Sequence, residues 1–206
     1  MFIVPDVPNR VSPGEALRAN VVKVFDGDGF LANVWHPLRE TWVQNIPFRF
    51  AFIDAPEIDQ PFGPESRDFL NHLIAGKPLI LDPIGKESTG YMPIDPYKRV
   101  LCMGFLTEQM GVGRIEYYMN GKCRVGTVKN GRPATRNIEL EMIVNGWAWV
   151  VEQYTFDRET EYFEAQDDAR QNRRGLWSMD DPEPPWVFKR RQKRWKRVND
   201  GQGRLL

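Results

Sequence analysis

The sequence predicts a single-domain α+β protein built around a small β-barrel of five strands, with about three helices. Three observations carry this prediction. Five short apolar segments have the length and composition of strands. A helical pattern falls between the third and fourth of them, and the other helical patterns follow the fifth. The 206 residues and 24.0 kDa suit one domain with appendages, and the 41% hydrophobic content supplies a sizeable core.

The strands are predicted from apolar runs bounded by turn residues. They cover residues 20–25, 30–35, the start of 49–57, 78–81 and 99–105. Between the first two lies Asp26-Gly27-Asp28-Gly29, and Asp-Gly between apolar runs is a good hairpin signal. We expect residues 36–45 to form a polar connection and residues 86–97 a long polar loop.

The helices are predicted from apolar periodicity and from their end signals. They begin at Gly63-Pro64-Glu65, at residue 138 and at a cap on Asp157, and they end near Gly76, residue 144 and Gly175. Few simple topologies fit five strands with helices in these places. An OB-fold barrel is the leading one, and such barrels bind oligonucleotides on one face.

Three regions are expected along the chain: an extended lead-in over residues 1–18, the barrel domain over 19–188, and a basic C-terminal tail over 189–206. Residues 182–186 form a Pro-rich strap before the tail. Within the domain, residues 107–136 are an insertion, with a hairpin formed by 115–119 and 123–128 around Asn120-Gly121. The hairpin either extends a nucleic-acid track or is a solvated decoration. Its basic residues are Arg114, Lys122, Arg124, Lys129, Arg132 and Arg136.

Charge is distributed unevenly along the chain. The formal net charge is zero, but residues 189–206 carry eight Lys/Arg and one acid, so the body carries −7 and the tail +7. Seven of the nine residues over 189–197 are basic, with Trp195 among them. Two interpretations stay open. The tail binds phosphates in a salt-dependent way, or it is a disordered solubilising segment.

Several protein classes are disfavoured by composition. No apolar run approaches the length of a membrane helix, and the N-terminus lacks the pattern of a secretory signal, which favours a cytoplasmic protein, although a trimmed or exported form stays open. Cys102 and Cys123 are too few for a disulfide framework and are expected to be free thiols. No obligate protein partner is evident, and we expect a monomer.

Five motifs bear on function as a set: Asp26-Gly27-Asp28; Arg49 with Asp54, Pro56 and Glu57; Asp95-Pro96-Tyr97-Lys98-Arg99; Gly146 with Ala148 and Tyr154; and Gly175-Leu176-Trp177. Each alone is weak. Their order and spacing together resemble the staphylococcal nuclease family, from about residue 20 to 186. The resemblance implies an OB-fold nuclease that uses Ca²⁺, with Mg²⁺ or Mn²⁺ as alternatives. It also implies cleavage of DNA and/or RNA with low sequence specificity, leaving 3′-phosphates.

The resemblance also assigns a metal site. Asp28, Asp54 and the backbone carbonyl of Ala55 would bind the ion, with Asp26 behind them. The residue types agree with this, because carboxylates are hard oxygen donors that suit Ca²⁺. On a straight strand Arg49 and Asp54 would point to opposite faces. We therefore expect a bend or bulge before Pro56.

The remaining site residues would act on the phosphodiester. Glu57 matches the family's general base, and Arg49 and Arg99 match its phosphate-binding arginines, whose planar fork can bond two phosphoryl oxygens. Tyr97 and Tyr154 match tyrosines of the nucleotide pocket. The rival hypothesis is a catalytically silent OB-fold module that only binds nucleic acid. This chain has all five charged residues of the family's site, Asp28, Arg49, Asp54, Glu57 and Arg99, and this argues against the silent module.

Two departures from the family pattern concern the turn before Arg99 and the nucleotide pocket. Lys98 stands where the family often has glycine, with Pro96 before the tyrosine, so the aim of Arg99 depends on an altered turn. Glu152 stands where the family has a second pocket tyrosine, which reduces the stacking surface.

Overall fold

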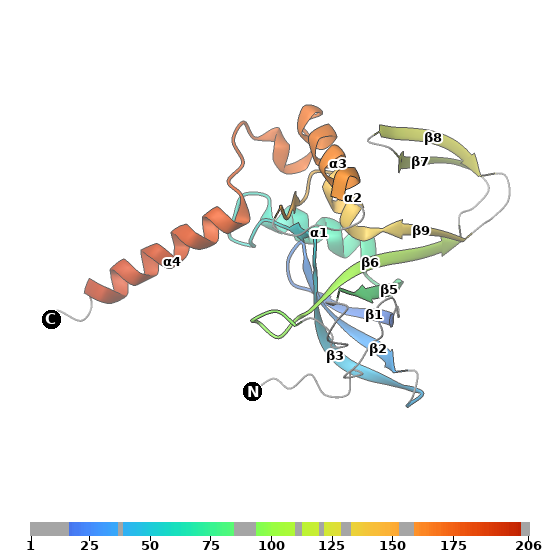
Figure 1. Cartoon of the computed structure of the whole chain (residues 1–206), viewed down its shortest axis with the longest axis horizontal. Helices are drawn as coiled ribbons and strands as arrows, with labels where there is room; N and C mark the ends of the chain where they lie inside the picture. The colour runs from blue at the N-terminus through green and yellow to red at the C-terminus, as the bar shows by residue number, and fades with distance from the viewer. Residues whose placement is uncertain are drawn as a thin grey trace.

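A five-stranded barrel forms the centre of the molecule in this computed structural model, which describes residues 17–36, 39–84, 94–109, 113–119, 122–128, 133–152 and 159–202, with the side chains of 107–135 and 198–202 excepted. The strands are β1 (Leu17–Val24), β2 (Gly29–His36), β3 (Thr41–Phe50), β5 (Pro78–Pro83) and β6 (Val100–Gln109). They pair in the order β3-β2-β1-β5-β6, and a parallel β3–β6 pairing closes the barrel. The predicted α+β barrel is confirmed (Figure 1).

Strand β3 is longer than the sequence predicts. The polar connection expected over 36–45 is wrong in its second half, because β3 begins at Thr41. Val43 and Ile46 face the core three residues apart, which breaks the two-residue alternation of a regular strand. The register shift opposite Ala32–Val34 and the positive φ of 58° at Asn45 explain this spacing as a bulge.

The core lies inside the barrel and beneath the helices at one end of it. Phe30, Phe48 and Phe50 are fully buried, and the ring centroid of Phe30 lies 5.6 Å from that of Phe48 and 5.2 Å from that of Phe50. The covering helices are α1 (Gly63–Ile74), α2 (Ile138–Val144) and α3 (Glu159–Gln171). Their buried side chains join the barrel residues in one cluster. A short strand pair, β4 (Ile53–Asp54) with β10 (Trp149–Val150), links the barrel to the segment after α2.

The insertion contains the predicted hairpin, formed by β7 (Gly113–Met119) and β8 (Lys122–Val128). A further strand that the sequence did not predict, β9 (Pro133–Asn137), pairs with β6. Arg136 binds Glu141, and the side chains of the other five basic residues of the insertion lie outside the described part.

A fourth helix, α4 (Pro185–Gln202), includes the last two residues of the expected strap and the expected tail as far as residue 202. The disordered alternative for the basic segment is wrong over 189–202. Figure 1 shows α4 beginning against the body and projecting away from it. None of the described helices is both long enough and apolar enough to cross a membrane.

Candidate active site

Three neighbouring strands bring the predicted site residues to one end of the barrel. Gly29 pairs with Arg49, and Arg49 pairs with Leu101. Gly29, Arg49 and Leu101 thus lie side by side on three strands. Asp28 precedes Gly29 by one residue, and Arg99 precedes Leu101 by two. Residues from distant motifs meet here because the closing β3–β6 pairing places the third and fifth predicted strands side by side.

A sharp bend between β3 and β4 sets the position of Asp54. Ala51 N donates to Cys102 O at 3.0 Å, and Phe52 N donates to Glu139 Oε1 at 3.0 Å. These bonds turn the chain, and Arg49 Nη2 reaches Asp54 Oδ1 at 2.6 Å. The bend expected before Pro56 is confirmed, and a carboxylate of α2 helps to hold it.

Asp28 and Asp54 form a buried acidic pair around the Arg49 guanidinium. Their exposed fractions are 3% and 7%. Arg49 Nη2 lies 3.1 Å from Asp28 Oδ2, which also accepts a hydrogen bond from Ala55 N at 3.0 Å. Burial raises the pKa of Asp28 to about 6 against the opposing charge of Arg49, and burial followed by the charge of Asp28 raises the pKa of Asp54. Keeping both carboxylates ionised therefore costs desolvation free energy, and such perturbed carboxylates are typical of functional sites.

The Asp26–Gly29 turn is seated against α1. Asp26 Oδ1 accepts a hydrogen bond from Asp28 N at 3.2 Å, so Asp26 shapes the turn behind the acidic pair. A Cβ on Gly27 would lie 2.0 Å from Ser66 Oγ and 2.6 Å from Ala55 Cβ. Only glycine fits this close approach, which keeps Asp28 next to Ala55.

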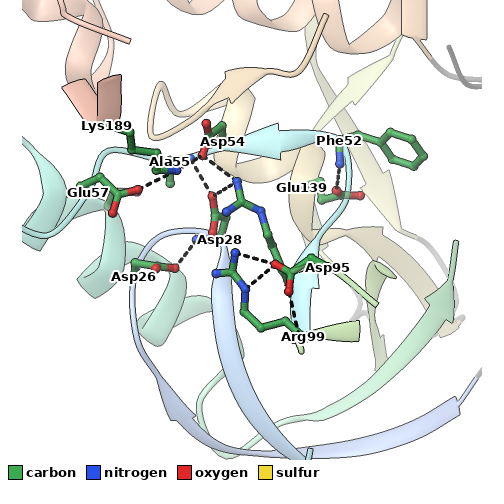
Figure 2. Close-up of polar contacts among 12 residues, drawn as sticks. Asp26, Asp28, Phe52, Asp54, Ala55, Glu57, Asp95, Arg99, Glu139 and Lys189 are labelled. Carbon is green, nitrogen blue, oxygen red and sulfur yellow. Dashed lines mark hydrogen bonds and ion pairs between the residues drawn. The ribbon is translucent and has the colours of Figure 1, made fainter. Parts of the chain in front are cut away.

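Glu57 lies at the rim of the site. Its backbone N–H donates to Gln60 Oε1 at 2.9 Å, and its side chain is 38% exposed. Lys189 Nζ, from α4, lies 2.7 Å from Glu57 Oε1 and 3.1 Å from Asp54 Oδ1 (Figure 2). Burial opposes the charged form of this lysine, but Asp54 and Glu57 raise its pKa.

Arg99 is held by Asp95, four residues earlier. Asp95 Oδ2 accepts from Arg99 Nε at 2.8 Å, and Asp95 Oδ1 accepts from the backbone N–H groups of Tyr97 and Arg99, both at 2.9 Å. The Arg99 guanidinium lies over the Tyr97 ring at 5.5 Å from its centroid. Tyr97 is 72% exposed at the mouth of the site, whereas Tyr154 lies outside the described residues.

A cleft of about 660 Å³ opens between these residues and α4. One side is formed by the barrel and its loops, including Arg49, Asp54, Tyr97 and Arg99, and Glu152 also lines it. The other side is formed by α4, through Trp186, Lys189, Arg190 and Lys193.

The acidic pair fits a hard divalent cation. Within the described part of the chain, Asp28 Oδ1 and Asp54 Oδ2 accept no hydrogen bond, so each carboxylate keeps an oxygen for an ion. No group of three or more His, Cys, Asp or Glu side chains gathers as a metal site among the described residues. A cation held by these two carboxylates would take its remaining ligands from backbone carbonyl and water oxygens, and such a donor set suits Ca²⁺ better than a transition metal.

A closed five-stranded barrel with helices over one end defines the class of an OB-fold protein, and its charged residues gather at one end of the barrel. Residues 47–179 match the family model described as staphylococcal nuclease homologue. The chain belongs to the staphylococcal nuclease family, as the resemblance of its motifs implies.

Relatives that match most of this chain carry the names of nucleases. The chain is 30% identical to an Escherichia coli protein named uncharacterized endonuclease, over 85% of this chain and 87% of that one. It is 30% identical to a Haemophilus influenzae protein of the same name, over 87% of this chain and 76% of that one. It is 28% identical to a Shigella flexneri protein named micrococcal nuclease, over 85% of this chain and 82% of that one.

Sequence reasoning does not reveal the roles of three side chains that shape the site: Asp95, Lys189 and Glu139, whose carboxylate holds the bend. Asp95 lies within one of the motifs, and its spacing to Arg99, an acid four residues before a base, is the signal in the sequence that it could hold the arginine. Lys189 is the first residue of the basic run, and no local pattern indicates which way that helix points.

Proposed function

We propose that this chain is a metal-dependent endonuclease that hydrolyses phosphodiester bonds of DNA and/or RNA with low sequence specificity. Family membership and the names of the relatives support the nuclease activity. The observation that carries the assignment of residues is the convergence of Arg49, Asp28 and Asp54 next to Glu57, with Arg99 lining the same cleft.

A cation is proposed to be held by Asp28, Asp54 and the Ala55 carbonyl. Ca²⁺ fits the oxygen donors, and Mg²⁺ and Mn²⁺ are the alternatives. When bound, the ion supplies Lewis-acid neutralisation of a phosphoryl oxygen. The chain's own contribution is to keep two buried carboxylates ionised and oriented, through the hydrogen bond from Ala55 N and the ion pairs of Arg49.

Glu57 is proposed to accept the proton of the attacking water. Its side chain is 38% exposed, so water can reach it. The ion pair with Lys189 at 2.7 Å fixes the position of the Glu57 carboxylate, and a positioned carboxylate is a usual general base.

The two arginines are proposed to bind the phosphate and to stabilise the charge of the transition state. Both ion pairs of Arg49 use Nη2, and Arg99 binds Asp95 through Nε and Nη2. Within the described part, each arginine keeps Nη1 without a hydrogen-bond partner. Each guanidinium is thus fixed at one edge and offers another N–H edge to a phosphoryl oxygen, which is the preorganisation that lowers an electrostatic barrier.

Tyr97 is proposed to stack on a base of the substrate. Stacking on an aromatic ring contributes about 1–3 kcal/mol per base and discriminates little between bases, which supports low sequence specificity. The corresponding role of Tyr154 and the 3′-phosphate product stay predictions from the family resemblance.

The test is cleavage of labelled single-stranded DNA and RNA with Ca²⁺ or with chelator. We expect chelator to abolish cleavage, and Glu57→Gln and Arg49→Ala to lower kcat by about 10²–10³ each, as for the loss of one preorganised group. Glu65→Gln, an exposed acid of the first turn of α1, is the matched control and should retain full activity.

Two outcomes would contradict the proposal. Binding of nucleic acid without metal-dependent cleavage would leave the silent OB-fold module as the function. Full activity in both Glu57→Gln and Arg49→Ala would show that the nuclease site lies elsewhere.

A further inference from the structure

We propose that the basic face of α4 is the second wall of the substrate groove and binds the phosphates of a single nucleic-acid strand that leaves the cleft. The proposal rests on the proposed nuclease function. It adds a phosphate-binding subsite on α4, a helix whose position the sequence does not reveal. The face is formed by Trp186, Lys189, Arg190 and Lys193.

The spacing of these four residues places them on one side of the helix. Steps of three, four and seven residues from Trp186 return to the same face of an α-helix. All four line the cleft that also contains Arg49 and Arg99. The basic face of α4 is thus continuous with the phosphate-binding arginines.

The start of α4 is fixed to the body, so its face has a defined position. The Trp186 ring packs edge-on against Trp149, with centroids 6.4 Å apart, and Phe188 is buried. Gln60 Nε2 donates to Glu183 O at 2.9 Å, and the Glu183 carboxylate binds Arg191. These contacts join α4 to the loop that carries Glu57.

Lys189 connects the helix face to the reacting centre. Its Nζ lies within 3.1 Å of both Asp54 and Glu57, so the first cation of the face already stands beside the two carboxylates. Arg190 and Lys193 follow along the cleft. Four residues of helix advance about 6 Å, so Lys193 is placed about one turn beyond Lys189, away from the centre.

The charge of α4 indicates a polyanionic partner. Seven of the nine residues over 189–197 are basic and none is acidic. Like charges four residues apart, as at Lys189/Lys193 and Arg190/Arg194, repel each other and destabilise a helix. A bound strand of phosphates would remove this repulsion and release counterions.

A single strand fits the groove better than an acidic peptide. Tyr97 is 72% exposed across the cleft from α4 and offers a ring on which a base can stack, while the cations of α4 face the backbone. An aromatic platform opposite a line of positive charge is the usual arrangement for binding single strands without sequence preference.

The test compares two double variants in the Glu57→Gln background, which is expected to bind without cutting. Arg190→Ala/Lys193→Ala removes one Arg and one Lys from the cleft face. Arg194→Ala/Lys196→Ala removes the same charges from exposed positions further along the helix that do not line the cleft. Alanine favours helix, so both should keep α4, which circular dichroism checks. The probe is a fluorescein-labelled 20-nucleotide single-stranded DNA, titrated over a series of salt concentrations.

We expect Arg190→Ala/Lys193→Ala to weaken binding at least about tenfold near 0.1 M salt. The slope of log K against log salt should fall by about 1.4, because each phosphate contact with a single strand contributes about 0.7. The Arg194/Lys196 variant should change both quantities by much less.

Equal losses in the two variants, or none in either, would overturn the proposal that this face forms the groove. Competition by polyglutamate as strong as that by unlabelled strand would overturn the nucleic-acid partner. If the parental protein neither binds nor cleaves the strand, the proposed nuclease function itself fails, which is a distinguishable result.

Discussion

Arg49 and Arg99 line the same cleft but are held by different kinds of structure. Arg49 comes from a barrel strand and faces two carboxylates, Asp28 and Asp54, that are almost fully buried. Arg99 follows a turn and faces one carboxylate, Asp95, which is also bound by two backbone N–H groups.

The position of Arg49 depends on electrostatic interactions, and the position of Arg99 depends on backbone conformation. The Arg49 half of the site concentrates desolvated charge, and its order depends on the balance of those charges. The Arg99 half depends on backbone geometry: Lys98 adopts a positive φ of 66°, and Asp95 closes the turn around it. The first half should respond to changes of charge, and the second to changes of backbone freedom.

The largest expected effect is on stability when each arginine is replaced by methionine. Arg49→Met leaves two buried carboxylates without their cation, and losing one partner of a buried ionic group costs about 3–5 kcal/mol. Arg99→Met should cost about 1–2 kcal/mol, because the Asp95 carboxylate keeps its backbone donors. Urea unfolding at pH 7 with chelator measures both.

A double variant sharpens this comparison. Arg49→Met/Asp54→Asn removes one charge of each sign and should recover part of the loss, and added Ca²⁺ should stabilise Arg49→Met through the site that Arg49 otherwise neutralises. Equal losses in the two single methionine variants would contradict the difference between the halves.

The second expected effect concerns Glu139, the buried acid behind the Arg49 half. It accepts a hydrogen bond from Phe52 N at the bend, and burial raises its pKa from 4.5 to about 8. Between these values the folded protein keeps a proton that the unfolded chain has lost. Its contribution to stability is therefore complete below pH 4.5 and is lost as the pH rises towards 8.

Glu139→Gln should remove this dependence while keeping an acceptor for Phe52 N. The stability of the variant relative to the natural chain should rise by about 1.4 kcal/mol per pH unit between roughly pH 5 and 7.5. Unfolding of both proteins at pH 5, 6, 7 and 8 measures it, and all other titrating groups are shared. A difference that does not change with pH would mean that Glu139 is ionised in the folded protein.

The two halves also differ in how far the sequence alone predicts them. The barrel follows from apolar runs bounded by turn residues. The family resemblance implies that Arg49 and Asp54 share a site, and the bend follows from the conflict between their spacing and a straight strand. The sequence does not reveal what holds the bend, because Glu139 is 85 or more residues away in the chain and its pairing is tertiary. The position of Lys189 is hidden for the same reason. A run of basic residues fits a solvated tail and an anchored helix equally well, and the tertiary packing of Trp186 and Phe188 decides between them.

The smallest expected effect tests the strain in the Arg99 half. Glycine tolerates the left-handed conformation best, so Lys98→Gly should stabilise the protein by up to about 1 kcal/mol. The greater freedom of glycine in the unfolded chain reduces this gain. Glu40, with a φ of 48° in the turn before β3, offers a matched control, since Glu40→Gly relieves similar strain away from the cleft. Both variants should gain similar stability by urea unfolding.

Nuclease activity should also stay within about threefold in both variants, because the hydrogen bonds of Asp95, not the lysine, orient Arg99. A tenfold loss confined to Lys98→Gly would show that the strained lysine itself orients the arginine.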